Sequence, residues 1–148
     1  MEAIIFCGVQ AVGKSTFYQD HFSQTHVRIS LDLLRTRRRE RIFLAACLES
    51  GQRFVVDNTN PTEVERRVYI QAAKEKRFKV IGYYFASKAE EALSRNAARP
   101  KNERVPDVAI KATLAKLERP SWSEGFDELY HVAIKQKEFI VSEWHHAL

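Results

Sequence analysis

A glycine-containing segment with one lysine and one serine lies close to the N-terminus. It follows the pattern Gly-x-x-x-x-Gly-Lys-Ser and comes directly after an apolar run at positions 3–7. Glycine permits a tight turn in which backbone N–H groups point inward, and the start of a following helix adds partial positive charge. The lysine can then reach the outer phosphates of a nucleotide, and the serine hydroxyl can bind Mg²⁺. The pattern predicts a P-loop for ATP and Mg²⁺, formed by Gly8, Val9, Gln10, Ala11, Val12, Gly13, Lys14, Ser15 and Thr16.

An aspartate and an arginine, three residues apart, could serve the acceptor side of a phosphoryl transfer. A kinase needs a base for the proton of the attacking hydroxyl, and an arginine can hold an anionic group through two parallel hydrogen bonds. We expect a helix from about Leu33 to Ser50, with Asp32 and Arg35 on one face at its start. The alternative is an aspartate that only favours the helix N-terminus, beside a solvated basic face. The lack of an apolar stripe between Arg35 and Arg41 favours a surface that faces water or a ligand.

Polar residues also follow a predicted buried strand at positions 54–57. Asp57 would stand at the carboxyl end of this strand, where ligands bind in open α/β sheets. In P-loop enzymes such an aspartate commonly orients Mg²⁺, directly or through water. The alternative is a turn in which the aspartate is structural. We favour the metal-orienting role for Asp57, with Asn60 as the cap of a helix whose first residue is Pro61.

A second basic segment covers residues 95–104. Arg95 and Arg99 are spaced to share a helical face, and a mobile basic segment could close over ATP as a lid. Phosphoryl transfer gains from an arginine placed against the charge of the transferring group, a catalytic role that Arg99 could take. From the spacing alone, a solvated basic loop stays equally open.

The elements that must hold these residues alternate between strands and helices. Apolar runs predict strands near residues 3–7, 26–30, 54–57, 80–85 and 131–134, with helical patterns between them. This alternation predicts an α/β fold with a parallel, doubly wound sheet. We expect one P-loop domain over residues 1–148, adenylate-kinase-like, with four to five strands flanked by helices and an arginine-rich helical lid. Val64, Val68 and Ala72 would form the buried stripe of one helix, and residues 139–148 are ambiguous.

The composition of the 148 residues is that of a globular domain, with 45% hydrophobic and 29% charged residues and a formal net charge of +5. The charge is compatible with an anionic partner. No apolar run approaches the length of a membrane span, and the N-terminus does not begin like a signal peptide. We therefore expect an intracellular, cytoplasmic protein without a membrane partner. Cys7 and Cys47 are expected to be buried thiols rather than a disulfide.

Taken in order, four blocks resemble the 5′-hydroxyl polynucleotide kinases, the P-loop kinases of phage, bacterial and mammalian end-healing enzymes. The blocks are 8–16, Asp32-x-x-Arg35, 56–61, and Arg95-Asn96-x-x-Arg99 leading to Val105-Pro106; residues 118–127 also look like the family's C-terminal portion. The resemblance implies ATP-dependent phosphorylation of a 5′-OH end of DNA or RNA. It implies Asp32 as general base, Arg35 on an acceptor phosphate, and Arg95 and Arg99 on the ATP phosphates. Asp57, Asn58 and Thr59 would lie in the network of Mg²⁺ and acceptor.

This chain departs from the family at two places, and two other functions stay open. Gln10 stands where the family often has proline, and Ser30-Leu31-Asp32 lacks the Arg-Asp-Asp of some members. A kinase of a small hydroxyl acceptor, such as a nucleoside, sugar or sugar acid, would keep Asp32 but need no basic groove. A nucleotide-dependent binding module for nucleic-acid ends would need no aspartate in the base position. Larger members carry phosphatase or ligase domains, so proteins with those activities are expected partners; the oligomeric state is not predicted.

Overall fold

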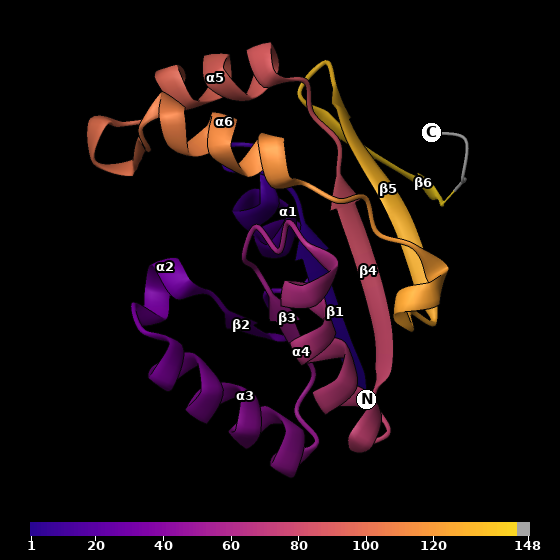
Figure 1. The fold of residues 1–148 in the computed structure, drawn as a ribbon. Coiled ribbons are helices and arrows are strands. Elements are labelled where there is room, and N and C mark those ends of the chain that lie inside the picture. The colour runs from indigo at the N-terminus through magenta and orange to yellow at the C-terminus, as the bar shows by residue number, and fades with distance from the viewer. Residues whose placement is uncertain (145–148) are drawn as a thin grey trace.

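The computed structural model describes residues 1–144, which form one mostly parallel sheet with helices on both faces (Figure 1). The strand order is β2-β3-β1-β4-β5-β6, and only the pairing of β6 with β5 is antiparallel within this part of the chain. The strands are β1 (Glu2–Cys7), β2 (Val27–Ile29), β3 (Phe54–Val56), β4 (Lys79–Phe85), β5 (Glu128–Lys135) and β6 (Glu138–Glu143).

The helices divide between the two faces of the sheet. Buried residues of α3 and α4 belong to one apolar cluster, and those of α1, α5 and α6 belong to the other. The centre of the sheet is shielded from solvent, because strands β1 and β3 are buried along most of their length. The helices are α1 (Lys14–His21), α2 (Leu31–Leu34), α3 (Arg37–Ser50), α4 (Glu63–Glu75), α5 (Ala89–Ala98) and α6 (Asp107–Lys116), with short 3₁₀ turns η1 (Lys101–Glu103) and η2 (Trp122–Glu124).

The predicted α/β fold is confirmed, and the sheet gains a sixth strand from the segment whose sequence was ambiguous. Gln136 and Lys137 both adopt positive φ, of 51° and 64°, between β5 and β6. A two-residue turn with this geometry matches the twist of an antiparallel hairpin, but it is usually made by Asn or Gly. The turn therefore carries no sequence signal, and its hairpin brings Phe139 against Phe17 of α1. Residues 145–148 of the ambiguous segment lie outside the described part of the chain.

The single helix expected from Leu33 to Ser50 is wrong. The chain breaks at Arg35, whose φ of 74° ends α2, and it restarts at Thr36, whose side chain accepts a hydrogen bond from the Arg39 N–H. Arg35 therefore lies outside the helix that contains Asp32, and the two do not share a helical face. A threonine is a good N-cap, so Thr36 was the available signal for this break.

The buried face predicted for α4 is also wrong. Val64 and Val68 are 65% and 60% exposed, and the helix buries Arg66, Tyr69 and Ile70 instead. The cap of the helix is Thr62 rather than Asn60, and the helix starts at Glu63, two residues later than expected. None of the helices within residues 1–144 has the length and apolarity that crossing a membrane requires.

Candidate nucleotide and acceptor site

The predicted site residues gather where the parallel strands end. The P-loop follows β1, Asp32 lies just beyond β2, and Asp57 comes directly after β3. Because the carboxyl ends of parallel strands meet at one edge of the sheet, these three segments are neighbours. Helices α5 and α6 lie at the same edge (Figure 1). The topology thus brings the P-loop, the two aspartates and the predicted lid to one place.

The P-loop is closed by its own lysine. Lys14 Nζ donates hydrogen bonds to the carbonyl oxygens of Gly8 at 2.7 Å and Val9 at 2.8 Å. The loop enters αL geometry at Ala11 (φ 63°) and Gly13 (φ 86°), and α1 begins at Lys14. Backbone in this conformation, together with a helix N-terminus, forms a concave site for anions. The geometry is that of a phosphate-binding loop.

The charges around Lys14 show which predicted residues lie near it. Burial lowers the pKa of Lys14 to about 8, and the opposing effect of Asp57 is the next largest. Asp32 also raises this pKa, and Arg99 lowers it. Asp32, Asp57 and Arg99 therefore all lie within electrostatic reach of the lysine ammonium. The structure brings together four residues that the sequence assigned to one site.

Nucleotide binding is expected to be coupled to proton uptake at alkaline pH. At pH 9 the Lys14 side chain of the free protein is largely neutral, whereas the phosphates of ADP favour its charged form. The protein should then take up roughly one proton for each ADP that binds. This proton uptake should decrease as the pH falls below about 8. Calorimetry of ADP binding at pH 9 in buffers of different ionisation enthalpy measures this. Lys76→Met should leave the uptake intact, and equal heats in all buffers would contradict the assignment.

Arg28 is a site residue that the sequence reasoning missed. From β2, its Nε donates to Asp57 Oδ2 at 2.8 Å and its Nη2 donates to Ser15 Oγ at 3.0 Å. Ser15 Oγ in turn donates to Asp57 Oδ2 at 3.2 Å. A guanidinium therefore joins the two side chains that the sequence predicted around Mg²⁺. Only the alternation of the short strand hinted that Arg28 would point away from the core.

Asn58 and Thr59 hold the surrounding segments in place. Asn58 Oδ1 accepts the N–H of Leu31, next to Asp32, at 2.9 Å, and its Nδ2 donates to Glu40 Oε2 at 2.8 Å. The Thr59 carbonyl accepts the Gly8 N–H at 2.9 Å. Both residues were predicted to bind the acceptor. The structure gives Asn58 a clear structural use, because it ties the end of β3 to the helix that carries Asp32.

The buried carboxylate of Glu40 completes this support. Tyr69 Oη donates to Glu40 Oε1 at 2.7 Å, and Arg37 Nη1 donates to the same oxygen at 3.0 Å. Burial, followed by the contact with Glu40, raises the pKa of Tyr69 well above its usual range, so Tyr69 is a hydrogen-bond donor. The network of Arg37, Glu40, Asn58 and Tyr69 anchors α3 and α2 against β3 and α4. No periodicity in the sequence indicated a buried glutamate in so basic a helix.

The segment predicted to be a lid is anchored at both ends of its loop. Asn96, which is buried, donates to the Val105 carbonyl at 2.6 Å and accepts the Val105 N–H at 3.0 Å. Arg95 Nη1 donates to Ser87 Oγ at 3.2 Å, and its Nη2 lies 3.7 Å from Glu91. Arg99 follows the last residue of α5 in extended backbone, so the shared helical face expected for the two arginines is wrong. Arg99 is nevertheless the lid arginine whose charge reaches Lys14.

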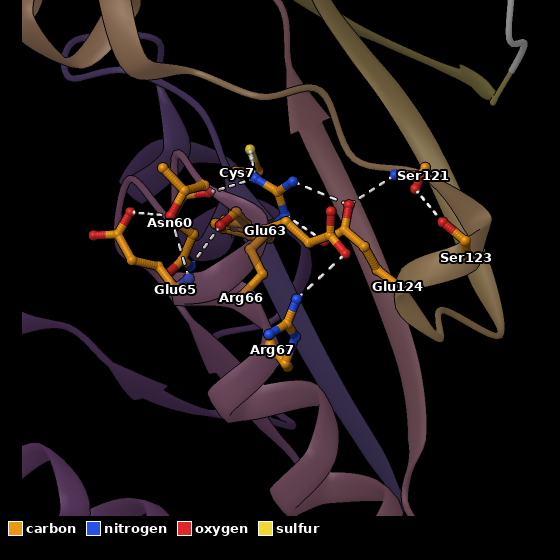
Figure 2. A network of polar contacts seen from close by, with 11 residues as sticks. Cys7, Asn60, Glu63, Glu65, Arg66, Arg67, Ser121, Ser123 and Glu124 are labelled. Carbon is orange, nitrogen blue, oxygen red and sulfur yellow. Dashed lines mark hydrogen bonds and ion pairs between the residues drawn. The ribbon is translucent and has the colours of Figure 1, made fainter.

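A buried ion pair lies beside Cys7, the last residue of β1 (Figure 2). Arg66 is 0% exposed, and its Nε and Nη2 donate to the two carboxylate oxygens of Glu124 at 2.7 and 3.0 Å. Its Nη1 donates to the Asn60 carbonyl at 2.9 Å and contacts Cys7 Sγ at 3.5 Å. Burial raises the pKa of the Cys7 thiol to about 11, so this residue stays a neutral thiol. Because Cys7 precedes Gly8, the pair ties α4 and η2 to the base of the loop.

Known proteins resemble both the sequence and the fold. The "Bifunctional polynucleotide phosphatase/kinase" of Schizosaccharomyces pombe is 26% identical over 138 residues, covering 90% of this chain and 34% of the relative. The chain thus spans about a third of the curated relatives it matches. This similarity confirms the resemblance to polynucleotide kinases that the four blocks indicated.

Two solved structures have the same fold. One is described as the Pnkp1/Rnl/Hen1 RNA repair complex, with a TM-score of 0.68, 19% identity, and coverage of 78% of this chain and 43% of that chain. The other is a gluconokinase from Sinorhizobium meliloti 1021, with a TM-score of 0.64, 18% identity, and coverage of 91% and 83%. Residues 4–120, most of the chain, match the family described as an AAA domain. The chain belongs to this family of AAA domains.

Proposed function

We propose that this domain is an ATP-dependent kinase that transfers the γ-phosphoryl group to the 5′-OH end of DNA or RNA. The observation that carries the proposal is the position of Asp32. It is an exposed carboxylate within electrostatic reach of the P-loop lysine, and the arginine-rich start of α3 follows it in the chain. The similarity to a polynucleotide phosphatase/kinase over 90% of the chain supports the same acceptor.

On this proposal the two substrates meet between Lys14 and Asp32. The loop N–H groups and Lys14 hold the ATP phosphates. Asp32 accepts the proton of the 5′-hydroxyl as its oxygen attacks the γ-phosphorus. The bond to the bridging β–γ oxygen breaks, and the electron pair leaves with ADP. Arg99 balances charge on the transferring group, Arg95 supports the lid, and Arg35 binds a phosphate of the acceptor.

Ser15 and Asp57 fit a Mg²⁺ ion. Both offer oxygen atoms, which this ion prefers, and they already share a positively charged guanidinium in the structure. When bound with ATP, the ion supplies positive charge that neutralises the phosphates.

The exposed face of α3 suits a polynucleotide better than a small acceptor. Four exposed arginines lie on α3 or just before it: Arg35, Arg38, Arg39 and Arg41. Among residues 1–144, none of the four has a carboxylate within ion-pair distance. One helical turn beyond Arg38 and Arg39, the apolar Ile42 and Phe43 are 53% and 48% exposed. Arginines bind backbone phosphates, and an exposed aromatic ring can stack on a base. We propose that the acceptor strand runs along this face, the α3 track, from the 5′ end at Asp32 toward Phe43.

An acceptor screen tests the proposed function directly. The protein is incubated with γ-labelled ATP and Mg²⁺, together with a nucleoside, gluconate, a dinucleotide, or 5′-OH DNA and RNA oligonucleotides. We expect label only on the nucleic acids, more efficiently on oligonucleotides than on the dinucleotide. Label on gluconate or the nucleoside alone would replace the proposal with a small-acceptor kinase. ATP-dependent oligonucleotide binding without any transfer would identify a binding module.

Loss of charge from the α3 track should weaken acceptor binding without affecting ATP. Removing two phosphate contacts in Arg38→Ala/Arg39→Ala should raise the oligonucleotide KM and flatten the salt dependence of binding by roughly 1.4 in log–log slope. The matched control is Arg53→Ala/Arg77→Ala, which removes the same charge near the opposite edge of the sheet. Measurement of the oligonucleotide KM and of oligonucleotide binding, from low to moderate salt, distinguishes the two double variants. Equal effects from both double variants would indicate net charge alone and exclude the track.

We further propose that the domain works inside the cell, where ATP is supplied, beside phosphatase or ligase activities. The support is the combined phosphatase and kinase of the curated relative and the repair complex among the similar structures.

A further inference from the structure

Arg28 bridges Ser15 and Asp57, the two side chains that would hold a Mg²⁺ ion. Its guanidinium donates one hydrogen bond to Asp57 Oδ2 and one to Ser15 Oγ, while these two oxygens lie 3.2 Å apart. The Asp57 side chain is 2% exposed, whereas that of Arg28 is 27% exposed. The carboxylate is therefore fixed in the interior, and the arginine reaches it from the surface.

A carboxylate as buried as Asp57 needs a positive partner. An unpaired carboxylate in the interior carries a large desolvation cost. When no divalent ion is bound, the carboxylate therefore needs another cation as its counter-charge. Lys14 does not provide it through a direct contact, because its Nζ bonds the Gly8 and Val9 carbonyls. Arg28 does provide it, at 2.8 Å from Oδ2.

The guanidinium of Arg28 would compete with a Mg²⁺ ion for these two oxygens. Mg²⁺ sits about 2.0–2.1 Å from its ligands and demands an octahedral shell. The two hydrogen bonds of Arg28 use the Asp57 and Ser15 oxygens that such an ion would take, and two cations at this separation repel each other. We therefore expect occupation by one cation to disfavour occupation by the other.

We propose that Arg28 is a built-in counter-ion that holds the Ser15–Asp57 pair before Mg²⁺ arrives and is displaced when the metal enters with a nucleotide. Arg28 is then a positioning residue that lowers the affinity of the empty site for free metal and favours entry of the metal together with nucleotide. This inference rests on the Mg·ATP part of the proposed function and is independent of the acceptor.

Metal binding without nucleotide or turnover tests the displacement. Arg28→Gln removes the competing cation, so the variant should bind Mn²⁺ roughly tenfold to a hundredfold more tightly than the wild-type protein, as measured by electron paramagnetic resonance. Mn²⁺ alone should also raise the Tm of the variant by more than that of the wild type. Adding Asp57→Asn to the variant should abolish both gains, and Arg53→Gln is the matched control. Equal Mn²⁺ affinity in wild type and Arg28→Gln would overturn the proposal.

A second measurement uses the wild-type protein and does not depend on the stability of any variant. The Nε–H of Arg28 is held against Asp57 and should give a slowly exchanging ¹⁵N–¹H signal. We expect this signal to survive addition of metal-free ADP and to change to that of a free arginine with Mg·ADP. Its persistence with Mg·ADP bound would overturn the proposal. Both experiments keep their meaning if no nucleic acid is phosphorylated, and failure to bind Mg·ADP at all would instead remove the nucleotide part of the proposed function.

Discussion

Replacement of Asp32 by asparagine is expected to slow phosphoryl transfer to a 5′-OH oligonucleotide by about a hundredfold to ten-thousandfold. Asparagine keeps the shape of the side chain but cannot accept the proton of the attacking hydroxyl. Asp32 is exposed on the short helix α2, so the substitution leaves the core untouched. Single-turnover kinetics with saturating ATP measure the chemical step.

The affinity of this variant for ATP should stay close to that of the wild type. Asp32 raises the pKa of Lys14, which is about 8, so the comparison belongs at pH 7 or below, where the lysine of the wild-type protein is charged. Asp20→Asn, an exposed aspartate of α1, is the matched control and should transfer at the wild-type rate. Normal turnover by Asp32→Asn would remove Asp32 from the mechanism, and lost ATP affinity would place it in the nucleotide site.

Replacement of Glu124 by glutamine should lower the free energy of unfolding more than any other substitution proposed for this protein. The glutamine keeps the size of the side chain but leaves the guanidinium of Arg66, which is 0% exposed, without its counter-charge. Breaking a buried pair in this way typically costs about 3–5 kcal/mol, which corresponds to a fall in Tm of about 10–16 °C in a domain of this size. Denaturant unfolding of the purified variant measures the change.

Glu63→Gln is the control with the same change of charge on the neighbouring helix. Glu63 pairs with Arg67 at 3.6 Å, but both side chains are about half exposed, so the expected cost is below about 0.5 kcal/mol. Replacing both members of the buried pair, in Arg66→Met/Glu124→Met, should recover much of the stability lost by Glu124→Gln, because no charge is then left unpaired. Similar losses of unfolding free energy in Glu63→Gln and Glu124→Gln would show that burial does not make the Arg66–Glu124 pair more important for stability.

The parts of the molecule that could be predicted are those with local signals. The P-loop is defined by residue types at fixed spacing, and the central strands by continuous apolar runs, so both were predicted in place. The position of Asp57 followed from the rule that ligands bind at the carboxyl ends of parallel strands. Asp32 was singled out by its spacing from Arg35 at the start of a predicted helix. The break at Arg35 was missed because Thr36 is a weak signal inside a helical pattern.

The rest depends on contacts between distant segments. Arg66 is buried because Glu124, 58 positions later, meets it bidentately, and no local pattern distinguishes it from the exposed Arg67. Glu40 is buried for a similar reason, through Asn58 and Tyr69. Arg28 was missed because a short edge strand does not show which side chain will reach the next loop. The burial and contacts of these three side chains depend on tertiary partners rather than on local secondary-structure propensity.

The clamp between Asn96 and Val105 limits how the predicted lid could move. Two hydrogen bonds join the end of α5 to the start of α6, and the two helices pack against each other. The basic loop between them is therefore tied at both ends. On the proposed function, we expect closure over ATP to be a hinge rotation of one hairpin about its two connections to the sheet, at Ala86–Lys88 and near Leu117. Such a motion would order few new residues, so the loss of conformational entropy on nucleotide binding would be small.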